Sequence, residues 1–151
     1  RGLGDVYKRQ VLSQAMRSRE IHRTYQAFAL GETAASGTID APIARLDGSL
    51  IQRTVDFASG ERSVTHYRTL AHCSVFSHLE LNLETGRTHQ IRVHMAYIGH
   101  PLLGDTLYNK TPGTFPRQAL HSASLSFVHP ITGEPLNFHA PLPEDMQNLL
   151  T

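Results

Sequence analysis

The polar segment Glu84–His94 (Glu-Thr-Gly-Arg-Thr-His-Gln-Ile-Arg-Val-His) holds the densest group of side chains that could do chemistry. It runs from a predicted strand end, through a glycine turn, into the first turns of a predicted helix. Backbone N–H groups and the positive end of the helix dipole meet at such a point. Arg87, His89 and Arg92 add side-chain donors. The pattern predicts an anion-binding site, and its alternative is an ordinary solvated helix start.

Other kinds of site fit the sequence less well. A zinc-protease helix needs two histidines four residues apart with a glutamate between them, whereas His89 and His94 are five apart and His100 follows the predicted helix. We therefore expect no metal. No Gly-x-Ser-x-Gly elbow is present. Cys73, the single cysteine, excludes an internal disulfide framework and a cysteine-based zinc site, and we expect it to be a buried, inert thiol.

The helix that positions the polar segment is predicted over residues 88–98. Thr88 is placed to cap its N-terminus, and Ile91 and Met95 begin an apolar stripe at helical spacing. Gly99 stands where a left-handed C-terminal residue is expected.

Most other elements of the chain are predicted strands. Leu79, Leu81 and Leu83 alternate with polar residues, which is typical of a strand with one buried face. Strands are expected over 22–30, 64–70 and 78–84, a terminal hairpin over 125–128 and 136–139, a short helix over 11–21, and irregular chain over 42–48. Strands outnumber helices without βαβ alternation. The expected class is α+β, with a mainly antiparallel mixed sheet and flanking helices.

The composition describes a packed domain with an unusual set of basic residues. The 151 residues are 40% hydrophobic and 18% charged, which suits one domain or a large part of one. No long apolar run and no basic start followed by an apolar segment is present, so we expect no membrane span, no signal peptide and a cytoplasmic location. Twelve of the fourteen basic residues are arginine. Arginine suits phosphate and base edges, although a GC-rich genome would also favour it.

A longer set of motifs resembles the RluA family of pseudouridine synthases. Its core is the segment 83–95 together with Ile98-Gly-His-Pro-Leu102 and Gly104-Asp105. The resemblance continues through Leu120-His121, His129-Pro130 and Thr132-Gly-Glu134, and upstream through Arg23-Thr-Tyr25, Gly37-x-Ile39, Pro42-Ile43 and Thr65-x-Tyr67. It covers about residues 11–145, which we interpret as a partial pseudouridine synthase catalytic domain over 11–151. Residues 1–10 do not match and look foreign to the domain.

The resemblance implies isomerisation of uridine to pseudouridine in rRNA or tRNA, without cofactor or metal. In that family an Asp attacks the nucleoside, an Arg pairs with the Asp, and a Tyr stacks on a uracil that is flipped out of the RNA. By matching position, Tyr25 and Arg92 are the expected catalytic residues. The expected RNA-binding or substrate-binding residues are Arg87, His89, Gln90 and Leu120. The expected partner is RNA, with no membrane and a monomeric intact protein.

The chain departs from the family at the nucleophile. The family's Arg-Leu-Asp-x-x-Thr-Ser-Gly block falls before Arg1 when counted back from Tyr25. Arg45-Leu46-Asp47 lies on the wrong side of Tyr25, and we expect Asp47 to be an exposed turn residue. The first hypothesis is therefore a synthase fragment that is inactive alone. The alternatives are a non-catalytic RNA-binding module of the same fold and an unrelated α+β enzyme for a small phosphorylated ligand.

Overall fold

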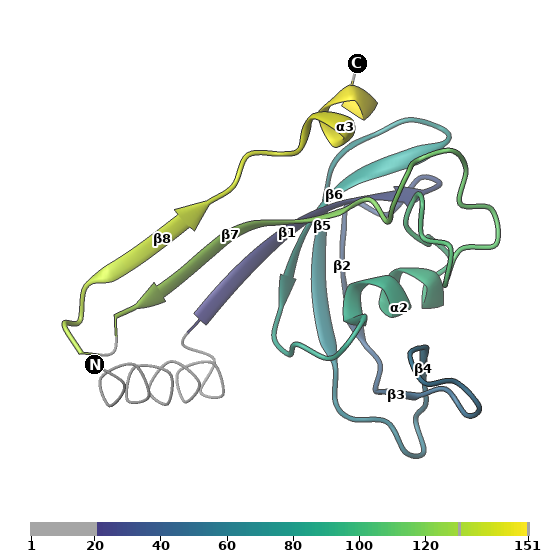
Figure 1. The fold of residues 1–151 in the computed structure, drawn as a ribbon, viewed down its shortest axis with the longest axis horizontal. Helices are drawn as coiled ribbons and strands as arrows, with labels where there is room; N and C mark the ends of the chain where they lie inside the picture. The colour runs from purple at the N-terminus through teal and green to yellow at the C-terminus, as the bar shows by residue number, and fades with distance from the viewer. Residues whose placement is uncertain (1–20, 130, 151) are drawn as a thin grey trace.

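Six strands form one antiparallel sheet in the computed structural model, which describes residues 21–129 and 131–150 (Figure 1). The strands are β1 (Ile21–Leu30), β2 (Ser36–Asp40), β5 (Val64–His72), β6 (Phe76–Leu83), β7 (Leu120–Val128) and β8 (Pro135–His139). Their order is β2-β5-β6-β1-β7-β8, and each neighbouring pair is antiparallel. The predicted α+β class and mainly antiparallel sheet are confirmed. The sheet was expected to be mixed, and the described strands contain no parallel pair.

The central strands follow the predicted alternation. Leu79 and Leu81 of β6 are fully buried, as are Ala27 and Ala29 of β1 on the same face of the sheet. Each fully buried leucine contributes about 1.5–3 kcal/mol relative to an exposed one. This burial fixes the register of β1 against β6, since a slip by one residue would turn the leucines to the opposite face.

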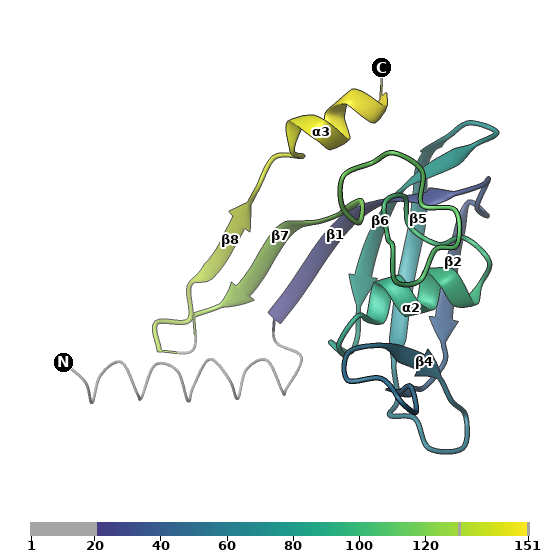
Figure 2. The same cartoon turned by 45° about the vertical axis from the view of Figure 1, so that its right-hand side comes forward.

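The two helices α2 (Gln90–Tyr97) and α3 (Glu144–Gln147) pack on opposite faces of the sheet (Figure 2). Ile91 and Met95 of α2 complete the core over Ala27, Leu79 and Leu81. Phe28 points to the other face, where it packs with Met146 of α3. A 3₁₀ turn, η1 (Asn148–Leu150), follows α3. Adjacent residues of β1 therefore serve two different cores.

A second, small sheet lies beside α2. Its strands are β3 (Ile43–Arg45) and β4 (Arg53–Val55), paired antiparallel. The expectation of irregular chain over 42–48 is therefore wrong at 43–45. Three-residue strands are too short to give an alternating pattern, and their pairing is what defines them. Asp47 lies in an exposed turn between them, as predicted.

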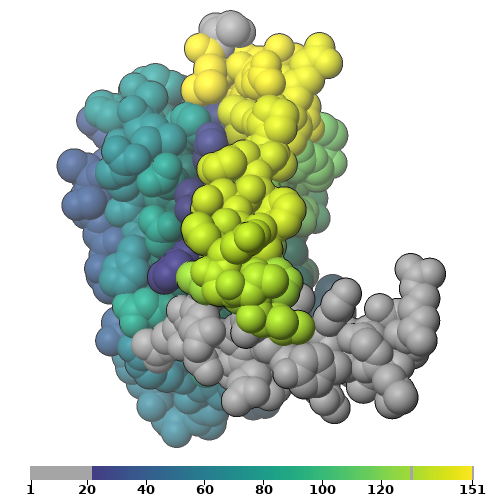
Figure 3. All heavy atoms as spheres, turned by 90° about the vertical axis from the view of Figure 1, so that its left-hand side faces the viewer, coloured from purple at the N-terminus to yellow at the C-terminus, as the bar shows by residue number. Residues whose placement is uncertain are grey.

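The terminal hairpin of β7 and β8 extends away from α2 along one side of the molecule (Figures 1 and 3). Both predicted arms are confirmed, and each strand is longer than expected. Most residues of β8 are exposed, including Phe138, whose ring stacks on Phe127 of β7 at 6.2 Å between centroids. Gly133 in the connecting turn has a φ of 75°, which lies in the left-handed region that favours glycine.

The turn between β5 and β6 carries the single cysteine. Cys73 is exposed there, and so the predicted buried thiol is wrong. Whether a turn between strands is covered depends on segments that are distant in the sequence, and residue order alone does not reveal it.

Two expectations concern the start of the chain. The predicted helix over 11–21 and the boundary after residue 10 lie outside the described residues, apart from residue 21. No helix among the described residues is long and apolar enough to cross a membrane.

His94 is a fully buried connection between three segments. Its Nε2–H donates to the Ala41 carbonyl at 2.8 Å, and its Nδ1 accepts the Thr65 hydroxyl at 2.8 Å. The bond that Nδ1 accepts requires the neutral ring, because both ring nitrogens of a protonated histidine are donors. Burial lowers the pKa of His94 below its ordinary 6.5, and burial also lowers the pKa of His78 and, with the Arg92 charge, that of His89.

These histidines predict a stability that declines in mild acid. Below pH 6.5 the unfolded chain binds protons that the folded chain excludes, so the free energy of unfolding falls as the pH drops through 6.5. Each histidine adds a slope of at most about 1.4 kcal/mol per pH unit. Urea unfolding between about pH 8 and pH 5 measures it. His94→Gln should flatten the slope, and exposed His139→Gln should leave it unchanged; equal slopes in all three proteins would contradict this assignment.

Candidate active site

All the sequence-predicted site residues line one pocket of about 340 Å³. β1 supplies Tyr25 and β7 supplies Leu120. The start of α2 and its preceding turn supply the other predicted residues, which are Arg87, His89, Gln90 and Arg92. The lining residues are Tyr25, Leu83, Arg87, His89, Gln90, Ile91, Arg92, Gln118 and Leu120. The volume lies at the lower end of the range of small-molecule sites, about 300–1,000 Å³. Segments far apart in the sequence thus converge on one small cavity.

Tyr25 owes its direction to the regular alternation of β1. Its pairing with β6 is uninterrupted, so its side chain lies on the same face as Ala27 and Leu81. The register shift lies on the neighbouring strand: Thr24 is paired with Ser124 of β7 and Tyr25 with Ser122, which leaves Ala123 as the extra residue of β7. Tyr25 packs against the α2-side core and remains half-buried, with one part of its ring in the pocket. The ring is therefore supported and still accessible.

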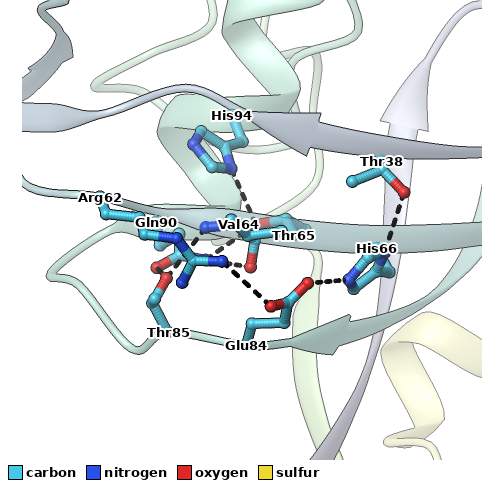
Figure 4. A network of polar contacts seen from close by, with 9 residues as sticks. All are labelled: Thr38, Arg62, Val64, Thr65, His66, Glu84, Thr85, Gln90 and His94. Carbon is cyan, nitrogen blue, oxygen red and sulfur yellow. Dashed lines mark hydrogen bonds and ion pairs between the residues drawn. The ribbon is translucent and has the colours of Figure 1, made fainter.

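The turn before α2 is organised by Gln90, which is almost fully buried (Figure 4). Its amide oxygen accepts the Thr85 hydroxyl at 2.7 Å and the Arg87 backbone N–H at 3.0 Å. Its amide nitrogen donates to the Val64 carbonyl and to Thr65 Oγ1, both at 3.0 Å. All the hydrogen-bonding positions of the amide are occupied within the protein. The side chain therefore positions the turn, and its expected contact with RNA stays a prediction.

His89, not Thr88, is the N-cap residue of α2. His89 has a left-handed backbone with φ 57° and ψ 20°, and no side chain caps the helix by a hydrogen bond. The predicted Thr88 cap is wrong because the helix begins one residue later, and the Gln90 backbone N–H that such a cap would bind donates to the Arg87 carbonyl at 3.1 Å. Left-handed geometry is unfavourable for a residue with a side chain and is kept only where neighbours enforce it.

Arg92 forms a paired hydrogen bond with Asp105, and this pair is the strongest electrostatic feature of the site. Nε donates to Oδ2 and Nη2 donates to Oδ1, each at 2.9 Å. The Asp105 side chain is 0% exposed and that of Arg92 is 15% exposed. Burial by itself would raise the pKa of Asp105, but the Arg92 hydrogen bonds and charge lower it below its ordinary value. The hydrogen bonds to Asp105 raise the pKa of Arg92.

The loop that carries Asp105 is built around that carboxylate. Asp105 Oδ1 also accepts the backbone N–H groups of Leu107 at 3.1 Å and Tyr108 at 3.2 Å. Gly104 has a φ of 71°, and a Cβ there would lie 1.8 Å from the Arg117 carbonyl oxygen, which explains why glycine is required. The loop therefore holds the carboxylate rigidly behind Arg92.

Tyr108 connects the site to the small sheet. Its ring lies 5.1 Å from Arg92 Cζ, close enough for a cation–π contact. Its hydroxyl accepts the Arg53 backbone N–H at 2.9 Å and shares a hydrogen bond of 2.7 Å with His89 Nδ1. Sequence reasoning missed Tyr108. Asp105 was quoted only as part of a motif, and its spacing from Arg92 carries no signal that the two side chains meet.

The Tyr25 ring and the Arg92 guanidinium line the pocket, but no carboxylate is found among its described lining residues. Asp105 is enclosed behind Arg92, so its carboxylate cannot reach a bound nucleoside. Asp47 lies in the exposed turn between β3 and β4 and is not part of the pocket. A nucleophilic carboxylate at this pocket must therefore come from outside the described residues.

The three histidines considered for a metal have separate partners. His94 bonds to Thr65 and Ala41, His89 bonds to Tyr108, and His100 Nδ1–H donates to the Leu30 carbonyl at 2.8 Å. Within residues 21–129 and 131–150, no three histidine, cysteine or acidic side chains are grouped so that they could hold a metal ion.

Comparison with known proteins identifies the family. The sequence model of the RNA pseudouridylate synthase family matches residues 9–97. The chain belongs to this family. This chain is 49% identical over 145 residues to the uncharacterized RNA pseudouridine synthase YjbO of Bacillus subtilis. The match covers 95% of this chain and 51% of that protein. The chain is 47% identical over 151 residues to ribosomal large subunit pseudouridine synthase D of Vibrio cholerae, covering 89% and 46%. The chain thus spans about half the length of these relatives.

Solved structures agree with the family assignment. The human RNA pseudouridylate synthase domain containing 1 superposes with a TM-score of 0.74 at 26% identity, covering 85% of this chain and 58% of that chain. The human RNA pseudouridylate synthase domain containing 4 has the same fold, with a TM-score of 0.75 at 22% identity over 91% and 64% of the two chains. The motifs predicted membership of the RluA family, and this prediction is confirmed.

Removing the charge of Asp105 should strongly lower the free energy of unfolding of the chain. Asp105→Asn keeps the shape but leaves Arg92 without its anion, and breaking a buried pair costs about 3 kcal/mol or more. The matched control is Glu80→Gln, because the Glu80–Arg68 pair, at 3.0 Å, is largely exposed. That change should cost less than about 1 kcal/mol. Urea unfolding of both variants measures the difference, and equal losses would show that the Arg92–Asp105 pair is no more important than a surface pair.

Proposed function

We propose that the chain is the uridine-recognition part of an RNA pseudouridine synthase, acting on ribosomal or transfer RNA in the cytoplasm. The observation that carries the proposal is the meeting of Tyr25 and Arg92 at one small pocket walled by Leu83 and Leu120. A flipped uracil needs an aromatic or apolar surface for stacking and a few polar groups at its edge. The names of the relatives support the same reading.

Tyr25 is proposed to stack on the uracil and to handle its proton. A phenol provides a flat ring for stacking and an acid–base group on the same side chain. The alternation of β1 turns this ring to the α2 side of the sheet, where it packs against apolar neighbours. Leu120, on the neighbouring strand β7, is proposed to form the opposite apolar wall.

Arg92 is proposed to orient and stabilise the nucleophilic carboxylate. Asp105 uses the Nε and one Nη2 proton of the guanidinium, so Nη1 remains available for a second anion. A guanidinium held on one side by a buried carboxylate is pre-organised to bind another on its free side. His89 and Arg87, which also line the pocket, are proposed to contact the RNA beside the flipped base.

A non-catalytic RNA-binding module is the second candidate. It is favoured by the absence of any carboxylate among the described residues that line the pocket. The two candidates differ in one property only, the ability to form pseudouridine once a carboxylate is supplied.

The chain as given should form no pseudouridine, because the 151 residues lack the Arg-Leu-Asp-x-x-Thr-Ser-Gly block and no described residue supplies a carboxylate to the pocket. Extending it upstream with an Arg-Leu-Asp-x-x-Thr-Ser-Gly segment taken from a relative should produce activity. Pseudouridine in bulk rRNA and tRNA is measured by mass spectrometry, with the Asp→Asn version of the extended chain as control. Pseudouridine formed by residues 1–151 alone would contradict the prediction. An inactive but folded extension that still binds RNA would favour the binding module.

Substitutions of Tyr25 should separate stacking from proton transfer in the extended enzyme. Tyr25→Phe keeps the ring, so RNA affinity should be unchanged while turnover falls at least 100-fold, about 3 kcal/mol in activation free energy. Tyr25→Leu should lose turnover and also weaken binding, since a base stacked on an aromatic side chain gains about 1–3 kcal/mol. Turnover, RNA affinity and melting temperature are measured together. Full activity of Tyr25→Phe would exclude a role of the hydroxyl in proton transfer.

A further inference from the structure

We infer that a second pocket, lined by Arg45, Arg53 and Arg87, binds the phosphodiester backbone of the RNA next to the flipped nucleotide. This pocket has a volume of about 380 Å³ and lies between the small sheet and the turn before α2. It is separate from the base pocket in all but one lining residue, Arg87, which lines both. The inference rests on the proposed function and adds the location of the RNA strand.

The charge of this arginine pocket is concentrated. Three guanidinium groups line it, and Glu61 is the one acidic residue among the described lining residues, while the whole sequence has a net charge of +1. Arg45 is exposed and Arg53 half-buried, so their charges face solvent beside the pocket. An effect of this charge appears at His89, whose pKa is lowered first by burial and then by Arg92 and Arg53. The surface around the pocket therefore attracts anions.

Two of the three arginines, Arg87 and Arg53, are held in place before any ligand arrives. Arg87 donates from Nε to the Arg62 carbonyl at 3.0 Å and pairs through Nη1 with Glu61 at 2.9 Å, which leaves Nη2 for a ligand. Arg53 donates from Nη1 to the Ile51 carbonyl at 3.1 Å, and its backbone N–H is bound by Tyr108. Because these bonds already restrict the side chains, less entropy is lost when they bind phosphate.

The position of Arg87 indicates what kind of anion the arginine pocket takes. A nucleotide whose base occupies the pocket of Tyr25 has its own phosphates at the rim of that pocket, where Arg87 stands. The next phosphate of the strand then reaches Arg53 on β4 and Arg45 on β3, which are directly opposite each other in the strand pair. Thr88 adds a hydroxyl donor. Two arginines on the small sheet and a third at the rim of the base pocket suit successive phosphates better than one small phosphate ester.

The test is RNA binding by the 151-residue chain, measured by fluorescence anisotropy with a labelled uridine-loop RNA hairpin at about 50–250 mM KCl. Arg45→Gln and Arg53→Gln should each weaken binding several-fold and lower the salt slope by about 0.7, and the double variant should lose about tenfold. Glu61→Gln should tighten binding, because it removes a negative charge from the pocket. The matched control is Arg68→Gln on β5, an exposed arginine paired with Glu80 outside both pockets, which should bind as the unaltered chain does.

The outcomes separate this inference from the proposed function. Arg45→Lys and Arg53→Lys should keep most of the affinity, which excludes misfolding as the cause of the glutamine effects. If the glutamine variants bind like Arg68→Gln while Tyr25→Leu weakens binding, the arginine pocket is not an RNA site and the base pocket stands. If uridine monophosphate displaces the hairpin at matched ionic strength and the salt slope is unaltered in the variants, the pocket takes a small phosphate. If the unaltered chain binds no RNA, both proposals fail.

Discussion

A buried carboxylate is the constraint around which the site is arranged. Asp105 has no exposed surface, and a charge in that position is tolerated only when it is paired and fully hydrogen-bonded. Arg92 and two backbone N–H groups meet this requirement, and in doing so they fix the loop after α2 against the helix. The guanidinium is consequently held in one orientation. The residue proposed to face the nucleophilic carboxylate is thus positioned by a carboxylate enclosed behind it.

The same loop is also bonded to the small sheet. Tyr108, three residues after Asp105, bonds to the backbone of Arg53 and to His89 while its ring lies against Arg92. The base pocket and the arginine pocket therefore share a support, although they use different lining residues apart from Arg87. Tyr108 thus contacts Arg53 of the arginine pocket and both His89 and Arg92 of the base pocket.

Prediction from the sequence succeeded where one residue pattern decides one element. The leucine alternation of β6 and the glycine after α2 are local signals, and both appear as expected, with Gly99 at a φ of 89°. The small sheet and the exposure of Cys73 were not predicted, because each depends on which distant segment packs nearby. The Thr88 cap was wrong because the left-handed backbone of His89 starts the helix one residue later, with the Gln90 N–H bound to the Arg87 carbonyl.

The sequence by itself determined the family, the α+β class and a set of candidate site residues, because long motifs and alternating burial can be recognised from residue order alone. Only the tertiary structure decided how those residues contact one another. It placed Asp105 behind Arg92, brought Tyr25 and Arg92 to one pocket, and occupied the whole amide of Gln90 within the protein. These outcomes depend on distances between side chains far apart in the chain, and such distances are set by packing across the sheet.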